Sequence, residues 1–336
     1  MMEWRKDPVI GQWVIVQTTD SWGPDQYEQE DHYLRQAPTC QFCPGKEYFT
    51  PPEVDAIRSS GSRPNGTGWS VRVVPNKFPA LRIEGDLDER RDGIFSLSNG
   101  IGAHEVVIET PDHHTHLADF SETQMIHLIH IYQRRLVDLS RDRRFKYIII
   151  FKNYGESAGT TIEHPHSQII ALPLIPKYVL EKMNGTRQYD TRNNRCVYCD
   201  MVEQEFRDQE RIIAQNDDFL AFCPFVSRYP FECWIFPKRH CCEFARMDDR
   251  ERQSLGNILK ETLRRVKICL SDPSYNYYVH SSPVNDGFGE SFHWHIEIVP
   301  KLTHTGGLEW GAGFHIVPTD PRMAAQYLRR LRPVLD

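Results

Sequence analysis

His164-Pro165-His166-Ser167-Gln168 places two imidazoles and a carboxamide at alternating positions of one short segment. Side chains on a β-strand point to the same face at every second position, so a strand here puts both histidines and the glutamine on one face. The preceding residues 146–151 have the pattern of a buried strand, and residues 153–161 are rich in small and hydroxyl side chains that can approach an anion closely. This arrangement favours phosphate chemistry over the alternative of two structural histidines on a half-buried strand.

The same His-x-His pattern returns at His293-Trp294-His295, and the surrounding pattern returns with it. In each half a strand-like segment is followed by a histidine close to a proline, an amphipathic helix, a second strand and then the histidine pair. The first helix begins at a capping box, residues 121–124, and apolar residues keep a three-four spacing in both helices. The chain is therefore predicted to be a tandem repeat of a strand-helix-strand-strand unit, with an α+β fold in which each repeat is an antiparallel sheet with a packed helix.

Each repeat also begins with a Cys-x-x-Cys pair, which adds two thiolates to the imidazoles of the same repeat. Two thiolates and two imidazoles form a tetrahedral zinc shell. One such pair alone is as typical of a redox motif, but two in matching positions favour metal. His113 is preferred to its neighbour His114 because it matches the repeat register of His240. The predicted ligands are Cys40, Cys43, His113 and His164 for one zinc ion, and Cys196, Cys199, His240 and His293 for the other.

The composition is typical of an intracellular enzyme. The 336 residues carry a formal net charge of -6, and this lack of a basic surplus disfavours a zinc-knuckle protein that binds nucleic acid. No apolar run is long enough to cross a membrane. Nine cysteines, an odd number with metal-type spacing, fit a reducing compartment better than a disulfide framework. We therefore expect a cytoplasmic protein that binds neither nucleic acid nor membranes.

Two domains are expected, one over residues 1–178 and the other over residues 190–336. They are predicted to be joined near residues 173–176, through a polar stretch that includes residues 185–190. The first domain contains the His-Pro-His-Ser-Gln segment and is expected to be the catalytic one.

Further segments of the chain resemble one known family. They are residues 4–8 (Trp-Arg-Lys-Asp-Pro), residues 73–81, Phe151-Lys152-Asn153 and the glycine-rich residues 306–313. Together with the Cys-x-x-Cys pairs and the His-Pro-His-Ser-Gln segment, they resemble the galactose-1-phosphate uridylyltransferase family, including ADP-glucose phosphorylase-like relatives. This family is the nucleotidyl-transferring branch of the histidine-triad superfamily. The resemblance therefore implies tandem histidine-triad-like repeats fused into one pseudo-symmetric unit.

By resemblance, His166 is the catalytic nucleophile. It attacks the α-phosphorus of a nucleoside-diphosphate hexose, releases a hexose 1-phosphate and forms a covalent nucleotidyl-histidine, which a second hexose 1-phosphate then attacks. The implied reaction is of the UDP-glucose plus galactose 1-phosphate type, with ping-pong kinetics. The backbone carbonyl of His164 is expected to fix the tautomer of His166, so zinc on the His164 ring is structural and does not touch substrate.

Gln168 is predicted to be catalytic and distinguishes a transferase from a hydrolase. Hydrolytic relatives have histidine at this position, which can carry a proton, whereas an amide can only hydrogen-bond the phosphoryl oxygens. An amide suits a phosphate leaving group, which departs as an anion. The substrate-binding residues that the resemblance implies are Asn76, Asn153, Gly159, Thr160, Thr161 and Glu309, although asparagines also commonly stabilise turns.

The second histidine pair is predicted to be a structural pseudo-site. His295 takes the place of the nucleophile, but Glu297 replaces the amide and would repel a phosphate. In the family, active sites are completed across a dimer, with the segment around Glu309 reaching the sugar. The resemblance therefore implies a homodimer that acts on nucleotide-sugar and sugar-phosphate substrates.

One departure from the family leaves the substrate open. The family has arginines after its first strand that bind substrate phosphates, but residues 16–24 contain none. Lys77, Arg72 or another arginine compensates, or the acceptor differs. An ADP-glucose phosphorylase-like adenylyltransferase that uses inorganic phosphate is therefore the main alternative. A nucleotide hydrolase and a non-catalytic, zinc-stabilised nucleotide-binding scaffold are the others.

Overall fold

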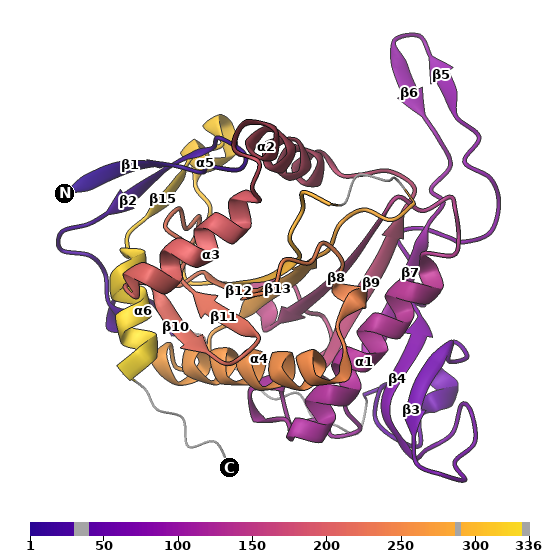
Figure 1. Ribbon diagram of the computed structural model, residues 1–336. Coiled ribbons are helices and arrows are strands. Elements are labelled where there is room, and N and C mark those ends of the chain that lie inside the picture. Colours follow the sequence, from indigo (N-terminus) through magenta and orange to yellow (C-terminus); the bar gives the residue numbers. More distant parts are fainter. Residues whose placement is uncertain (30–39, 286–289, 331–336) are drawn as a thin grey trace.

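A sheet of ten strands runs through the centre of the computed structural model, which describes residues 1–29, 40–285 and 290–330 (Figure 1). The strand order is β10-β11-β12-β14-β13-β8-β9-β7-β4-β3, and every neighbouring pair is antiparallel. The bounds are β3 (Asp55–Arg58), β4 (Trp69–Pro75), β7 (Ala103–Ile108), β8 (Tyr147–Tyr154), β9 (His166–Leu172), β10 (Ile212–Gln215), β11 (Phe219–Phe222), β12 (Cys233–Pro237), β13 (Tyr275–His280) and β14 (His295–Pro300).

The predicted repeat is present in both halves of the chain. In the first half β7, helix α1 (Glu122–Leu139), β8 and β9 follow one another, and in the second half β12, helix α4 (Asp249–Cys269), β13 and β14 do so. The halves share one sheet because β13 pairs with β8, where Tyr277 lies opposite Lys152. The α+β fold with two fused antiparallel repeats is therefore confirmed.

The sheet carries an apolar core on each face. Along β12, Cys233 and Ile235 belong to the larger core, whereas Trp234 and Phe236 belong to a second one. Alternate side chains of a strand point to opposite faces, so the two cores lie on opposite sides of the sheet. Helices α1 and α4 contact each other and fill the first core, and helices α2 (Lys177–Asn193) and α3 (Val197–Asp208) cover the second (Figure 1).

Helix α1 begins where its capping signal predicts. The Ser121 hydroxyl accepts a hydrogen bond of 3.2 Å from the backbone N–H of Gln124. The Gln124 side chain does not complete the box, because its amide instead donates to the backbone carbonyls of Ser70 and Glu109. The cap thus fixes the helix start, while the glutamine ties the helix to the strands beneath it.

The remaining elements lie around this central sheet. Strands β1 (Met2–Lys6), β2 (Trp13–Gln17) and β15 (His315–Val317) form a small second sheet, beside the short helix α5 (Gly307–Ala312) (Figure 1). Strands β5 (Arg90–Asp92) and β6 (Phe95–Leu97) form a hairpin that projects from the body, and α6 (Pro321–Arg330) is the last described helix. The polar stretch 185–190 is part of helix α2. Residues 331–336 of the predicted C-terminal domain lie outside the described residues.

No helix in the described part of the chain combines the length and the apolar character that crossing a membrane requires.

Helix α2 lies directly against the backbone of the turn between β1 and β2. A Cβ atom added at Gly185 would stand 1.7 Å from the carbonyl oxygen of Val9, which is far inside van der Waals contact. Only glycine lets the helix approach this closely. Gly185 therefore ties the small N-terminal sheet to the body of the molecule.

The first prediction concerns this contact. In a helix interior, alanine is normally favoured over glycine by about 1 kcal/mol. At Gly185 we expect the opposite, because the methyl group must push α2 off Val9, and Gly185→Ala should lower the free energy of unfolding by about 1–3 kcal/mol in chemical denaturation. Gly311→Ala in α5 is the control, since nothing lies within 4 Å of its added Cβ, and it should not destabilise the protein. Equal stability of both variants would contradict the contact.

Candidate functional site

The first Cys-x-x-Cys pair meets two histidines, as the repeat predicts. The Sγ atom of Cys43 lies 3.5 Å from Nδ1 of His113 and 3.7 Å from Nδ1 of His164, and these two nitrogens are 3.2 Å apart. With the Cys40 thiol, the four ligand atoms lie within 4.8 Å of one another. Nε2 of His164 donates to the Thr110 carbonyl at 2.8 Å, which leaves the Nδ1 lone pair for a metal. Two thiols and two imidazoles so placed are a donor set that suits a tetrahedral ion.

The second cluster repeats this geometry in the other half. The Sγ atom of Cys199 lies 3.2 Å from Nδ1 of His240 and 3.5 Å from Nδ1 of His293, with Cys196 beside them. Nε2 of His240 donates to the Glu290 carbonyl at 2.9 Å, so again a backbone oxygen fixes which nitrogen faces the sulfur atoms. All eight predicted ligands therefore converge, in two groups that could each hold one metal ion.

The two histidines of the first pair have different neighbours. Strand β9 begins at His166, so His164 precedes the strand and its ring turns to the cysteines. The Phe42 ring contacts both imidazoles, with its centroid 6.1 Å from that of His164 and 5.5 Å from that of His166. His166 and Gln168 do point the same way, because both line one cavity of about 240 Å³.

His166 is buried at the wall of this cavity, which we call the histidine cavity. Its Nδ1–H donates to the carbonyl of His164 at 2.8 Å, which leaves the lone pair on Nε2. Burial, followed by the positive charge of nearby Lys152, lowers the pKa of His166 to about 4. The imidazole is therefore neutral at pH 7 and can act as a nucleophile. The histidine cavity is lined by Gln41, Phe42, Phe49, Thr50, Pro51, Val74, Pro75, Asn76, Lys77, Phe78, Val106, Thr161, Ile162, His166 and Gln168.

His104 is a site residue that the sequence reasoning missed. Its Nδ1 accepts a hydrogen bond of 3.1 Å from the backbone N–H of Ala80, so the ring proton lies on Nε2. That proton is donated to Oε1 of Gln168 at 2.7 Å, and the same nitrogen lies 3.0 Å from the Asn76 amide. With its oxygen held by His104, Gln168 can offer its NH₂ group to a bound anion. The sequence did offer a signal for this residue, because His104 stands at the start of a segment with the pattern of a buried strand. That strand, β7, pairs with the strand of His166.

Asn153 is oriented by a residue from the second half of the chain. The Asn276 amide on β13 donates to Oδ1 of Asn153 at 2.8 Å and to the Ala158 carbonyl at 2.9 Å. The NH₂ group of Asn153 is then the part that remains to donate to a ligand. Gly159 follows in a left-handed conformation, with φ of 88°, and its added Cβ would lie 3.8 Å from that NH₂ group. The turn therefore keeps its backbone open next to Asn153.

The other predicted substrate contacts are distributed unevenly. Asn76 and Thr161 line the histidine cavity, whereas Asn153 near the end of β8 and Gly159 and Thr160 in the turn that follows do not line it. The Thr160 hydroxyl donates to the carbonyl of Ile162 at 3.1 Å. Glu309 is not brought to this cavity, because α5 lies beside β1 and β15, across the molecule from β7 and β9 (Figure 1).

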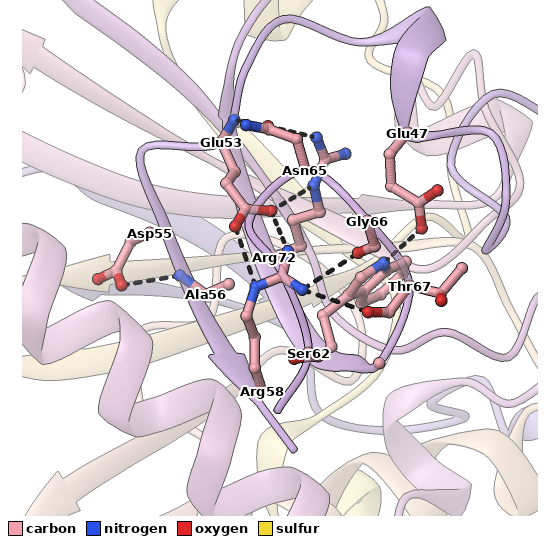
Figure 2. Close-up of polar contacts among 12 residues, drawn as sticks. Glu47, Glu53, Asp55, Ala56, Arg58, Ser62, Asn65, Gly66, Thr67 and Arg72 are labelled. Carbon is pink, nitrogen blue, oxygen red and sulfur yellow. Dashed lines mark hydrogen bonds and ion pairs between the residues drawn. The ribbon is translucent and has the colours of Figure 1, made fainter. Parts of the chain in front are cut away.

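Of the two cations named as substitutes for the missing arginines, only Lys77 is in position. Figure 2 shows that Arg72 and Arg58 both converge on Glu53. Nε of Arg72 donates to Glu53 at 2.9 Å, one of its terminal nitrogens donates to the Thr50 hydroxyl at 2.8 Å, and the residue is 1% exposed. Arg72 is therefore committed to the scaffold of β3 and β4. Lys77 is exposed and lines the histidine cavity.

In the second half, side chains of the protein itself occupy the space beside the histidine pair. Nζ of Lys182, from helix α2, lies 3.2 Å from Nε2 of His295 and forms an ion pair with Glu297. Arg228 donates to the other oxygen of Glu297 at 2.5 Å. Burial acts to raise the pKa of Glu297, but Arg228 and Lys182 hold it well below its usual range. The expected repulsion by a free carboxylate therefore does not operate, because the carboxylate is paired and an ammonium group occupies the space beside His295.

Two protein-family models match the chain one after the other. The N-terminal domain of galactose-1-phosphate uridyl transferase matches residues 2–176, and the C-terminal domain of the same family matches residues 182–331. The chain belongs to the galactose-1-phosphate uridylyltransferase family. This family consists of nucleotidyltransferases, so the resemblance inferred from the sequence is confirmed and the protein is an enzyme of this class.

Individual relatives of this family cover almost the whole chain. ADP-glucose phosphorylase from Arabidopsis thaliana is 34% identical over 98% of this chain and 93% of its own length. Galactose-1-phosphate uridylyltransferase from Thermotoga maritima is 29% identical over 98% of both proteins. A crystal structure of the Arabidopsis ADP-glucose phosphorylase with bound ADP-glucose superimposes with a TM-score of 0.83 at 33% identity, covering 99% of this chain and 100% of the other.

The second prediction tests the lysine that fills the second histidine pair. Lys182→Met leaves a fully buried carboxylate with one cation fewer, and breaking a buried ion pair typically costs about 3–5 kcal/mol of folding free energy. We expect a loss of about 3 kcal/mol by chemical denaturation, toward the low end of that range because Arg228 remains. The control is Lys177→Met on the same helix, whose exposed pair with Glu181 should contribute under about 0.5 kcal/mol. Equal effects of the two variants would show that Lys182 is not a structural cation.

Proposed function

We propose that this protein transfers a nucleoside monophosphate between a nucleoside-diphosphate hexose and a hexose 1-phosphate, through a covalent intermediate on His166. The proposed reaction is of the UDP-glucose plus galactose 1-phosphate type. One observation carries this proposal. The neutral, buried imidazole of His166 donates its Nδ1 proton to a backbone carbonyl, and it lines a cavity together with Gln168, whose amide oxygen already accepts a hydrogen bond from His104. That pairing supplies a nucleophile and a donor to a phosphoryl group, without a proton donor that would favour water.

The chemistry follows from the two side chains. The Nε2 lone pair of His166 attacks the α-phosphorus, the bond from that phosphorus to the bridging oxygen breaks, and the hexose 1-phosphate leaves as an anion that needs no proton. In the second step a phosphate oxygen of the acceptor attacks the same phosphorus and the histidine departs. The Gln168 NH₂ group stabilises the charge on the non-bridging oxygens in both steps. Asn76, Asn153, Gly159, Thr160 and Thr161 are proposed to bind the donor.

Zinc is the metal that best suits the two cysteine-histidine clusters. Each offers two sulfur and two nitrogen donors, which is the shell of structural zinc sites. Neither cluster contributes a residue to the histidine cavity, so the ion is proposed to hold the fold and not to act on substrate.

A second candidate reaction uses inorganic phosphate as the acceptor. The observation that favours it is the 34% identical relative named ADP-glucose phosphorylase, whose structure contains ADP-glucose. The absence of arginines in residues 16–24 is also easier to reconcile with a small acceptor, because only Lys77 offers a positive charge among the residues that line the histidine cavity. In this case His166 would carry an adenylyl group through the same two steps.

We further propose a cytoplasmic homodimer. Helix α5, which contains Glu309, lies across the molecule from β9 (Figure 1), and Glu309 does not line the histidine cavity, so we propose that it reaches the sugar from a second copy. All nine cysteines are free thiols, which fits a reducing compartment.

The third prediction is the covalent intermediate itself. After brief mixing with UDP-glucose or ADP-glucose, intact-mass spectrometry should show the added mass of the matching nucleoside monophosphate, because His166 is poised to attack the α-phosphorus. His166→Asn should show none, and Gln168→Glu should form it more slowly, since a carboxylate repels the phosphate.

The acceptor then separates the two candidate reactions. The isolated adduct should be discharged by galactose 1-phosphate in the first case and by inorganic phosphate in the second. Discharge by water alone would indicate a hydrolase. A folded wild-type protein that forms no adduct with any nucleotide sugar would leave the zinc-stabilised scaffold as the better description.

The fourth prediction is the metal content. Elemental analysis of the purified protein should give two zinc ions per chain, and Cys43→Ser and Cys199→Ser should each remove one of them, because each deletes one ligand of a different cluster. Cys242→Ser is the control, since this thiol belongs to neither cluster, and it should retain both ions. A full complement of zinc in all three variants would refute the assignment of ligands.

A further inference from the structure

A buried ion pair lies on the helix-facing side of the sheet, directly behind the catalytic histidine. Nζ of Lys152 on β8 lies 2.6 Å from a carboxylate oxygen of Glu109, at the end of β7, and the two side chains are 2% and 0% exposed. Both belong to the first half of the chain. Taking two such charges out of water is costly, so the pair by itself is weak support for a stabilising role.

The lysine makes one further contact, and it falls on the nucleophile. Nζ of Lys152 also donates to the backbone carbonyl of His166 at 3.0 Å. His166 is the first residue of β9, where the chain leaves the metal cluster and enters the sheet. The buried ammonium therefore holds the main chain at the point from which the nucleophilic ring projects.

A second contact holds the next residue from the same side. The Ser167 hydroxyl accepts a hydrogen bond of 2.7 Å from the Tyr132 hydroxyl on α1, which also contacts the Tyr277 hydroxyl on β13 and lies 3.4 Å from Glu109. Lysine, glutamate, serine and both tyrosines are all buried. One connected polar group thus holds His166 and Ser167 of β9 from behind, while the side chains of His166 and Gln168 face the histidine cavity.

We propose that Lys152, held by Glu109, is a positioning residue for nucleotidyl transfer: its ammonium group anchors the His166 carbonyl and thereby sets the place and angle of the imidazole relative to the α-phosphorus. This inference rests on the proposed function of His166. Lys152 does not line the cavity, so it does not touch substrate, and its hydrogen bond acts through the main chain of the nucleophile. Displacing a nucleophile by about 1 Å can lower the reaction rate roughly 100-fold. Loss of a single hydrogen bond that anchors the nucleophile can therefore slow the reaction measurably.

The chain contains a matched control for this pair. Arg135 on α1 and Glu105 on β7 form another buried ion pair on the same face of the sheet, with side chains 7% and 7% exposed and a distance of 2.7 Å. Glu105 on β7 and Glu109 just after it each lie two residues from Val107, so their side chains point the same way. No contact of Arg135 or Glu105 reaches the His166 carbonyl among the described residues.

The test compares two double variants, each of which removes both charges of one pair. In Glu109→Gln/Lys152→Met we expect the single-turnover rate of adduct formation to fall by about 10–100-fold, with nucleotide-sugar affinity within about twofold of the wild type. Glu105→Gln/Arg135→Met should keep the rate within about threefold at comparable loss of stability. Wild-type rates in the first variant, or equal losses in both, would overturn the inference.

A conservative variant keeps the test decisive if the first double variant does not fold. Lys152→Arg retains the charge and the pair but moves the donor, so we expect a folded protein that forms the adduct about 3–10-fold more slowly at unchanged affinity. An unchanged rate would again overturn the positioning role. Failure of the proposed function is recognised separately, because the wild-type protein would then form no adduct at all.

Discussion

One backbone carbonyl links the metal cluster to the chemistry. The ring of His164 belongs to the cysteine cluster, and its own carbonyl accepts the Nδ1 proton of His166 at 2.8 Å. The His164 ring is itself fixed on its far nitrogen by Thr110. Holding the ring at Thr110 and at the cysteine cluster restricts rotation about the bonds that join it to the main chain, and so restricts the His164 carbonyl. The tautomer of the nucleophile, and with it the function proposed here, therefore depends on a residue that does not line the histidine cavity.

The two halves use the same arrangement with opposite results. In the second half, His295 also donates from Nδ1 to the carbonyl of His293, at 2.9 Å. There, however, helix α2 inserts Lys182 beside the ring, and Glu297 holds the ammonium in place. The repeat thus preserves the main-chain geometry of a nucleophile, while a side chain from outside the repeat occupies the space that a phosphate would need. The difference between a cavity and a packed core is made by one helix, not by the histidine pair.

Because the two halves share one sheet, residues of the second half contribute to the site in the first half. Strand β13 pairs with β8, and its successive residues serve opposite faces of the sheet. Asn276 orients Asn153 on the side of the histidine cavity, whereas Tyr277 joins the polar group behind Ser167. A separate N-terminal domain would lack both contacts. The fusion of the repeats therefore supplies hydrogen bonds to the site as well as buried apolar surface.

Local patterns were enough to predict the repeat, the strands and helices that compose it, and the two groups of cysteines and histidines. Each of these depends on residue type and spacing along the chain, such as the cap at Ser121. The same reasoning failed where a contact joined distant segments. It missed His104, which reaches the Gln168 amide from the neighbouring strand. It also left Arg72 available to bind a phosphate, although the guanidinium group of Arg72 is hydrogen-bonded to Glu53 and Thr50.

The sequence by itself determined that this protein is a duplicated α+β enzyme of the galactose-1-phosphate uridylyltransferase family, with His166 and Gln168 as the candidate catalytic pair. Only the tertiary structure decided what surrounds them. His104 turns the amide of Gln168, Lys152 reaches the carbonyl of His166, and Lys182 fills the second pair. The physical reason is that a hydrogen bond or buried charge depends on distance in space. The chain pattern carries the period of a strand but not the identity of the side chain that will lie across from it.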